Sequence, residues 1–207
     1  MRPLPRVHAF TNVDLLGTPD FGVRAAAIAA AGPAVALHAR APGGGTKLLL
    51  AGAERMLTLS RPPEASVFVS GRPDLASAIG AHGVQLGMHD LTPNDARKVL
   101  PRGWIGRSVH SANEASSAVF EGADFLVVGN IFQTDSHPDR PAAGLDLIRE
   151  TARLGVPVIA IGGITPERAF EVKAAGAYGV AAIRSLWMAT DPAAATLALL
   201  LPWTSLS

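Results

Sequence analysis

Gly162 and Gly163 end an apolar run in a way that suggests a binding site for an anion. The run Pro157–Ile164 shows no alternation of apolar and polar residues, which is typical of a parallel strand buried on both faces. Thr165 and Pro166 then provide a cap and a first residue for a helix. Glycines let backbone N–H groups approach a ligand, and a helix N-terminus favours negative charge, so this turn predicts a phosphate site. A tight strand-to-helix turn without a ligand would use the same residues.

A second apolar run, Tyr178–Ile183, ends about one strand–helix unit later and is followed by Arg184. In a (β/α)8 barrel the loops after strands seven and eight frequently share one phosphate. We therefore predict that a phosphate lies against the backbone of both turns. The predicted phosphate-binding residues are Gly162, Gly163, Ala182, Ile183 and Arg184. An arginine after a strand is also typical of a solvated surface residue, and this alternative stays open for Arg184.

His110 is the best candidate for acid–base chemistry, because it follows the fifth predicted strand. Imidazole has a pKa near ~6.5 and can accept and donate a proton around neutrality. A histidine at this place could instead bind only the loop backbone. The other histidines near strand ends are expected to be structural or solvated, and they are His38, His89 and His137. Their spacing does not match a zinc site.

Eight strand-like segments alternate with helices along the whole chain. The predicted strands are Arg6–Phe10, Ala34–His38, Ser66–Val69, Gly83–Leu86, Trp104–Gly106, Asp124–Val128 and the two runs above. Predicted helices between them include Asp74–Ile79, Pro93–Leu100, Ala112–Glu121 and Pro166–Ala175. This alternation, without a linker, predicts a single α/β domain over residues 1–207, a (β/α)8 TIM barrel. An open doubly wound sheet is the alternative fold.

Composition excludes several classes of function. Only 17% of the 207 residues are charged and the net charge is +1, so we expect neither nucleic acid nor a membrane as a partner. The absence of cysteine excludes disulfides, thiolate zinc sites and cysteine nucleophiles. No apolar run approaches the length of a membrane span and no signal core precedes the first strand, so a cytoplasmic protein is expected.

The predicted strand ends lack two kinds of catalytic group. No lysine follows any strand, which argues against Schiff-base chemistry. Asp90 stands nearly alone among carboxylates there, so no tightly held metal ion is expected. We accordingly predict no cofactor.

Three segments resemble the thiamin phosphate synthase superfamily, and they are Ile105–Ser111, Asp124–Ser136 and Pro157–Ile164. The resemblance covers most of the chain and is most specific from Gly83 to Trp187. It implies a barrel and one of two activities. A synthase joins a pyrimidine pyrophosphate to a thiazole phosphate using magnesium, whereas a thiazole tautomerase aromatises a carboxythiazole phosphate by moving a proton.

Departures from the synthase pattern favour the tautomerase. Ser70 and Gly71 stand where the synthase has an Asn-Asp pair that serves magnesium, and His38–Pro42 replaces a Gln-x-Arg-x-Lys pattern. Asp90 alone keeps a metal-ligand match. The resemblance therefore predicts a tautomerase-like isomerase in which His110 moves the proton. The synthase and a non-catalytic protein that binds a phosphorylated ligand are the alternatives.

The predicted partner is a small phosphorylated thiazole. Arg40 is the hypothesis for its carboxylate, since a planar guanidinium matches a carboxylate bidentately. An arginine on the surface is an equally good interpretation of this residue. Asn130 and Thr134 are expected to orient the ring, and Ser136 to help bind the phosphate. A homodimer is possible, but no pattern in the sequence determines the oligomeric state.

Overall fold

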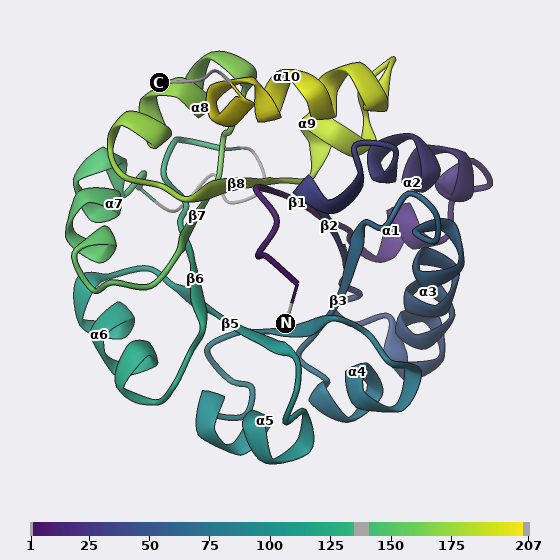
Figure 1. Cartoon of the computed structure of the whole chain (residues 1–207), viewed down its shortest axis with the longest axis horizontal. Helices are drawn as coiled ribbons and strands as arrows, with labels where there is room; N and C mark the ends of the chain where they lie inside the picture. Colours follow the sequence, from purple (N-terminus) through teal and green to yellow (C-terminus); the bar gives the residue numbers. More distant parts are fainter. Residues whose placement is uncertain (1, 135–140, 205–207) are drawn as a thin grey trace.

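The computed structural model describes residues 2–134 and 141–204 of this chain. Eight parallel strands close into a barrel in which each strand pairs with its neighbours in sequence and β8 pairs with β1 (Figure 1). The strands are β1 (Val7–Phe10), β2 (Val35–Ala39), β3 (Ser66–Ser70), β4 (Gly83–Leu86), β5 (Trp104–Val109), β6 (Phe125–Val128), β7 (Val158–Ile161) and β8 (Gly179–Ala182). The predicted (β/α)8 TIM barrel is confirmed, and the open sheet is excluded.

Helices surround the barrel as an outer ring (Figure 1). They are α1 (Val13–Leu16), α2 (Phe21–Ala29), α3 (Gly45–Leu59), α4 (Pro73–Ile79), α5 (Pro93–Val99), α6 (Ala112–Phe120), α7 (Gly144–Ala152), α8 (Pro166–Ala174), α9 (Arg184–Trp187) and α10 (Pro192–Thr204), with a short 3-10 turn η1 (Gly32–Ala34). Side chains cap several N-termini. The hydroxyl of Thr165 accepts from the N–H of Arg168, as expected, and that of Ser111 accepts from the N–H of Glu114. None of the described helices is both long and apolar enough to cross a membrane.

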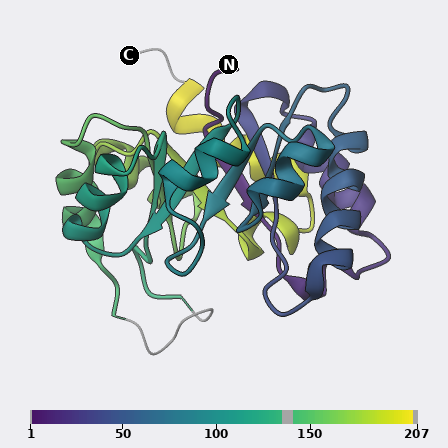
Figure 2. The ribbon, with the colours of Figure 1, turned by 90° about the horizontal axis from the view of Figure 1, so that it is seen from below.

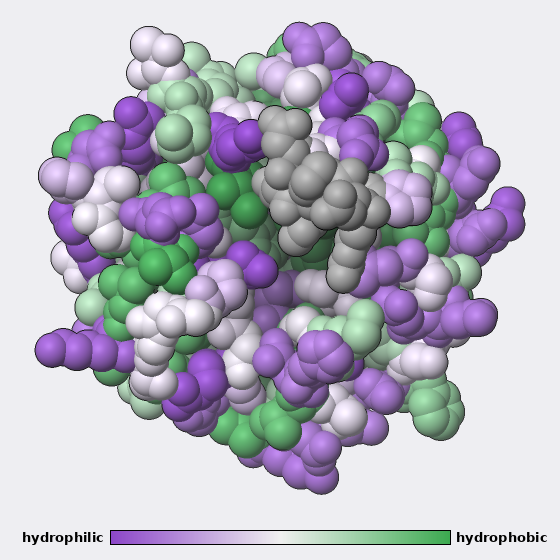
Figure 3. All heavy atoms as spheres, turned by 180° about the vertical axis from the view of Figure 1, so that it is seen from behind, coloured by the Kyte–Doolittle hydropathy of each residue, from purple (hydrophilic) through white to green (hydrophobic). Residues whose placement is uncertain are grey.

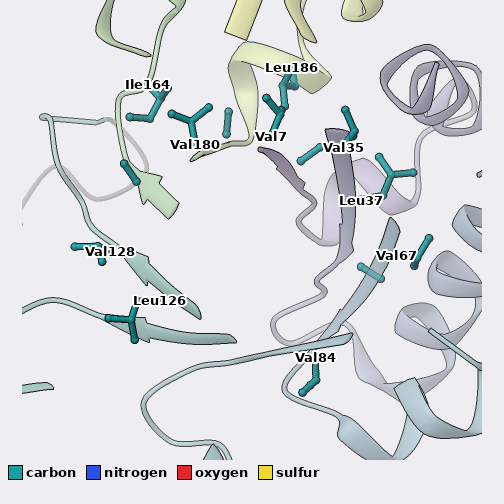
Figure 4. Packing of buried hydrophobic residues seen from close by; sticks show 14 of the residues in the cluster. Val7, Val35, Leu37, Val67, Val84, Leu126, Val128, Ile164, Val180 and Leu186 are labelled. Atoms are coloured by element: carbon teal, nitrogen blue, oxygen red, sulfur yellow. The ribbon is translucent and has the colours of Figure 1, made fainter. Parts of the chain in front are cut away.

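Apolar side chains form two separate layers. One lies between the strands and the helices, where residues such as Val35, Val84 and Val180 are buried (Figure 4). The other fills the interior of the barrel and includes Phe68 and Phe125. Because every strand is covered on both faces, the sequences of the strands are apolar runs without alternation.

The two ends of the barrel differ. The segment before β1 crosses one end, while the described residues of the β6–α7 connection extend from the other end (Figures 1 and 2). This second end is where the parallel strands finish, and its surface mixes hydrophilic and hydrophobic side chains (Figure 3). Barrel enzymes carry their active sites at this end, which directs attention to the residues that follow each strand.

Candidate functional site

A cavity of about 800 Å³ opens at the carboxyl ends of the strands. It brings together nearly all of the predicted site residues, which come from five different strand ends. Those that line it are Arg40, His110, Asn130, Thr134, Gly162, Gly163, Ala182, Ile183 and Arg184. Ser136 and His137 lie outside the described residues. A concave site with a few convergent polar groups is the usual form of a small-molecule site.

The two glycine turns form one wall of this cavity. Gly163 has φ +63, a conformation that side chains rarely adopt, and a Cβ atom there would lie 2.8 Å from the carbonyl oxygen of Gln133. A Cβ on Gly162 would lie 2.5 Å from the Cβ of Asn130. The positive φ at Gly163 and the close approach at Gly162 therefore explain both glycines. In the described part of the chain no backbone hydrogen bond involves the N–H of Gly163 or Ile183, which leaves these donors for a ligand.

Arg168 is a cavity residue that sequence reasoning missed. It lies in the first turn of α8, and its guanidinium donates to the carbonyl oxygen of Gly163 at 2.7 Å. The guanidinium also lies over the ring of Phe132, 4.6 Å from its centroid. Arg168 thus brings a positive charge next to the turn that was predicted to bind phosphate. Its place in the first turn of the helix that follows the glycine pair was the available signal.

His110 follows β5 at the mouth of the cavity, and its side chain is exposed. Its Nδ1 lies in hydrogen-bond contact with the carbonyl oxygen of Gly129, which can only accept. Nδ1 therefore carries a proton, so neutral His110 has its lone pair on Nε2. Its backbone N–H donates to the carboxylate of Glu114 at 2.8 Å. These contacts orient the ring and leave Nε2 free to meet a substrate.

Arg40 lines the cavity just after β2. The hydroxyl of Thr11 accepts from the backbone N–H of Arg40 at 2.9 Å, and it contacts the carbonyl oxygens of Arg40 and His38 at 3.0 Å. These contacts fix the backbone of the residue. Burial lowers the pKa of the Arg40 guanidinium, because the charged group is partly removed from water. A half-buried cation in a cavity is suited to an anionic ligand.

The residues at the ends of β3 and β4 do not fit the magnesium ion that the family resemblance implies. Asp90 offers one exposed carboxylate, and its Oδ2 already accepts from the N–H of Gly87 at 2.6 Å. Gly71 faces it with φ +71, and a Cβ there would lie 3.0 Å from Oδ1 of Asp90. The place of a second carboxylate is thus occupied by glycine. Across the described residues no three His, Cys, Asp or Glu side chains gather into a set that could hold a metal.

His38 and His8 lie below the cavity, inside the barrel, and both are fully buried. Nδ1 of His8 lies 2.8 Å from Nε2 of His38, and Nε2 of His8 lies 3.1 Å from the carbonyl oxygen of Pro5. His38 was expected to be structural or solvated, and its burial shows that it is structural. His89 is exposed on the β4–α5 connection, in agreement with a solvated histidine.

Comparison with known proteins decides the family. Residues 13–186 match the family model described as thiamine monophosphate synthase. Thiamine-phosphate synthase of Thermus thermophilus is 45% identical over 152 residues, which are 72% of this chain and 73% of that protein. The chain belongs to the thiamine monophosphate synthase family. Thiamine-phosphate synthase of Koribacter versatilis is 38% identical over 190 residues, which are 88% of this chain and 89% of that protein.

A solved structure extends the match to nearly the whole barrel. Thiamine phosphate pyrophosphorylase from Pyrococcus furiosus has a TM-score of 0.81 and 33% identity, over 95% of this chain and 94% of that one. A 3-hexulose-6-phosphate synthase, at 18% identity and a TM-score of 0.67, shares the fold alone.

These relatives overturn the predicted isomerase activity. The prediction of a thiazole tautomerase rested on departures at two strand ends, around Arg40 and at Ser70 and Gly71. The relatives named thiamine-phosphate synthase match this chain at 36–45% identity over most of its length, so the tautomerase assignment was wrong. Replacing a metal ligand at one strand end changes how charge is held there, but it leaves the barrel and its phosphate turns intact. The departures were therefore too local to identify the branch.

Proposed function

We propose that this chain is a synthase of thiamine biosynthesis that joins a pyrimidine pyrophosphate to a thiazole phosphate. The observation that carries the proposal is the 45% identity to a named thiamine-phosphate synthase, in a barrel whose predicted anion-binding residues line one cavity. In this reaction the thiazole ring nitrogen forms a bond to the exocyclic carbon of the pyrimidine. The bond from that carbon to oxygen breaks, and pyrophosphate leaves with the electron pair.

The thiazole phosphate is assigned to the wall formed by the β7 and β8 ends. Backbone N–H groups of Gly163 and Ile183 bind its phosphate oxygens, and Arg168 adds positive charge beside them. Ala182 and Arg184 complete this wall, and Asn130 and Thr134 lie beside the ring. Ser136 keeps its predicted place in phosphate binding. Anchoring the phosphate fixes the ring nitrogen in the direction of attack.

The pyrophosphate is assigned to the part of the cavity away from the β7 and β8 ends, between Arg40 after β2 and His110 after β5. The carboxylate that Arg40 was predicted to bind belonged to the tautomerase substrate, so its role becomes contact with pyrophosphate oxygens. Nε2 of His110, once protonated, donates to the leaving oxygen. A donor placed where negative charge develops in the transition state lowers the barrier. No step is assigned to magnesium, because the residues around Asp90 do not fit it.

The test is an assay with both substrates that follows thiamine phosphate and pyrophosphate together. Product formation that falls in a His110→Asn variant, but not in a His89→Asn variant, supports the proposal. His89 is a matched control, since it is an exposed histidine that does not line the cavity. Binding of the thiazole phosphate without product in any condition would refute the synthase and leave the non-catalytic binding protein. Product with a normal rate in His110→Asn would remove only the role of His110.

A further inference from the structure

Gln85 is a buried polar side chain in the wall of the cavity, between Ser70 on β3 and Ser108 on β5. It lies on β4, faces the cavity and is only 3% exposed. Its Oε1 is buried and has no hydrogen-bond partner within the described residues. A Cβ on the adjacent Gly106 would lie 2.2 Å from this oxygen, so the glycine provides the space for the amide. A buried amide with an unpaired acceptor lowers stability, which calls for another reason for its presence.

The contacts of Gln85 determine which end of the amide points toward Ser108. Nε2 lies 3.0 Å from the Oγ of Ser108 and 3.5 Å from the carbonyl oxygen of Leu86. With the amide reversed, Oε1 would face the Leu86 oxygen, and two acceptors would then repel each other. The amide therefore donates to Ser108. Since the Ser108 oxygen already accepts this bond, its own proton is directed elsewhere.

Ser108 lies near the end of β5, is partly exposed and lines the cavity. We propose that Gln85 is a positioning residue that fixes the Ser108 hydroxyl as a hydrogen-bond donor to the substrate. The partner is an acceptor atom on an uncharged ring. Under the proposed function, on which this inference rests, that atom is a nitrogen of the pyrimidine ring.

The position of the pair in the barrel supports this choice of ring. β4 and β8 stand four strands apart in the closed order, on opposite sides of the cavity. Ser108 lies on β5, two strands from β7 and three from β8, so a ring held by it lies outside the wall formed by the phosphate turns. An uncharged ring fits a wall in which burial penalises charge.

A double-mutant cycle tests whether Gln85 acts through Ser108. Gln85→Met removes the amide and keeps a side chain of similar length, and Ser108→Ala removes the hydroxyl. Binding of the pyrimidine pyrophosphate is measured by calorimetry, and KM and kcat in the synthase assay. Each single change is expected to weaken binding about five- to tenfold, as for a lost hydrogen bond, and to raise KM. The double variant is expected to bind no more weakly than Ser108→Ala alone.

Ser70→Ala is the control, because Ser70 is the neighbour of Gln85 on β3 and no hydrogen bond joins them. Its effect is expected to add to that of Gln85→Met. A purely structural role of Gln85 would give additive losses with Ser108→Ala and a lower melting temperature, and this outcome would overturn the inference. Should Gln85→Met not fold, a substrate analogue with C–H in place of the ring nitrogen serves instead. It should bind the wild type about five- to tenfold more weakly than the substrate, and Ser108→Ala equally.

The two proposals fail in different ways. Ligand binding that depends on the Gln85–Ser108 pair, without product, would remove the synthase and leave this inference standing. Product formation with additive effects of Gln85→Met and Ser108→Ala would support the synthase and overturn the role of Gln85.

Discussion

Acidification should destabilise this barrel through a buried pair of histidines, His8 and His38. Nε2 of His8 donates to the carbonyl oxygen of Pro5, and Nδ1 accepts from Nε2 of His38. The surrounding side chains are aromatic, with Phe68 and Phe125 within 5.8 Å of the His8 ring, centroid to centroid. Burial lowers the pKa of His8 to about 4 and that of His38 well below its ordinary value, with the charge of His8 as the second cause.

The sign and size of the effect follow from proton binding. In the unfolded chain a histidine binds its proton at a pKa near ~6.5, whereas folded His8 binds it only near about 4. Between these values the unfolded state therefore binds more protons, and stability falls as the pH is lowered. For His8 alone, the free energy of unfolding at pH ~5 should be about 2 kcal/mol lower than at neutrality. His38 adds a loss of the same sign.

Urea unfolding followed by circular dichroism at about pH 7 and about pH 5 measures this loss. His8→Gln is the matched variant, because glutamine can donate to Pro5 and accept from His38 but does not titrate. It should lose about 2 kcal/mol less than the wild type over the same pH range. Equal losses in both proteins would refute the argument and point to carboxylates as the titrating groups.

Three further outcomes are expected. His110→Asn should lower turnover about 10²-fold with little change in affinity for thiazole phosphate, measured by steady-state kinetics and calorimetry. Gly163→Val should weaken the binding of thiazole phosphate far more than that of unphosphorylated thiazole. A side chain at φ +63 displaces the carbonyl oxygen of Gln133 and disturbs the N–H donors of the turn. Equal losses of affinity for both ligands would mean that the glycine serves packing alone. Activity should survive EDTA, because Gly71 places no carboxylate beside Asp90, whereas Gly71→Asp should bind magnesium in calorimetry; a wild type that requires magnesium would contradict this.

The sequence was sufficient for the barrel because apolar runs and helix caps repeat along it. Strand β4, Gly83–Leu86, and the N-cap Thr165 appear where the sequence places them. β5 is longer than predicted, ending at Val109 in place of Gly106, so Ser108 lies within the strand. Small and polar residues near a strand end resemble a loop in sequence, and only pairing with β6 shows that they continue the strand.

The polar residues inside the barrel could not be assigned in the same way. A strand buried on both faces has no alternation, so the sequence does not tell which of its side chains point inward. For this reason Gln85 was missed, and His38 was placed at the mouth although it lies beneath it. The sequence gives no sign of a role for His8, because its contact with His38 depends on the register of β1 against β2, which no local pattern encodes.

The family membership and the missing carboxylate are compatible because different elements support the two sides of the cavity. The phosphate wall depends on glycines after β7, on Ile183 after β8 and on Arg168 in α8. The opposite side depends on the ends of β2, β3 and β4, where Gly71 faces Asp90. A substitution after β3 alters the charge that a ligand meets there without disturbing the N–H donors across the cavity. Ligand binding at the phosphate wall and the need for magnesium can therefore vary independently in this fold, which is why the two have to be measured separately.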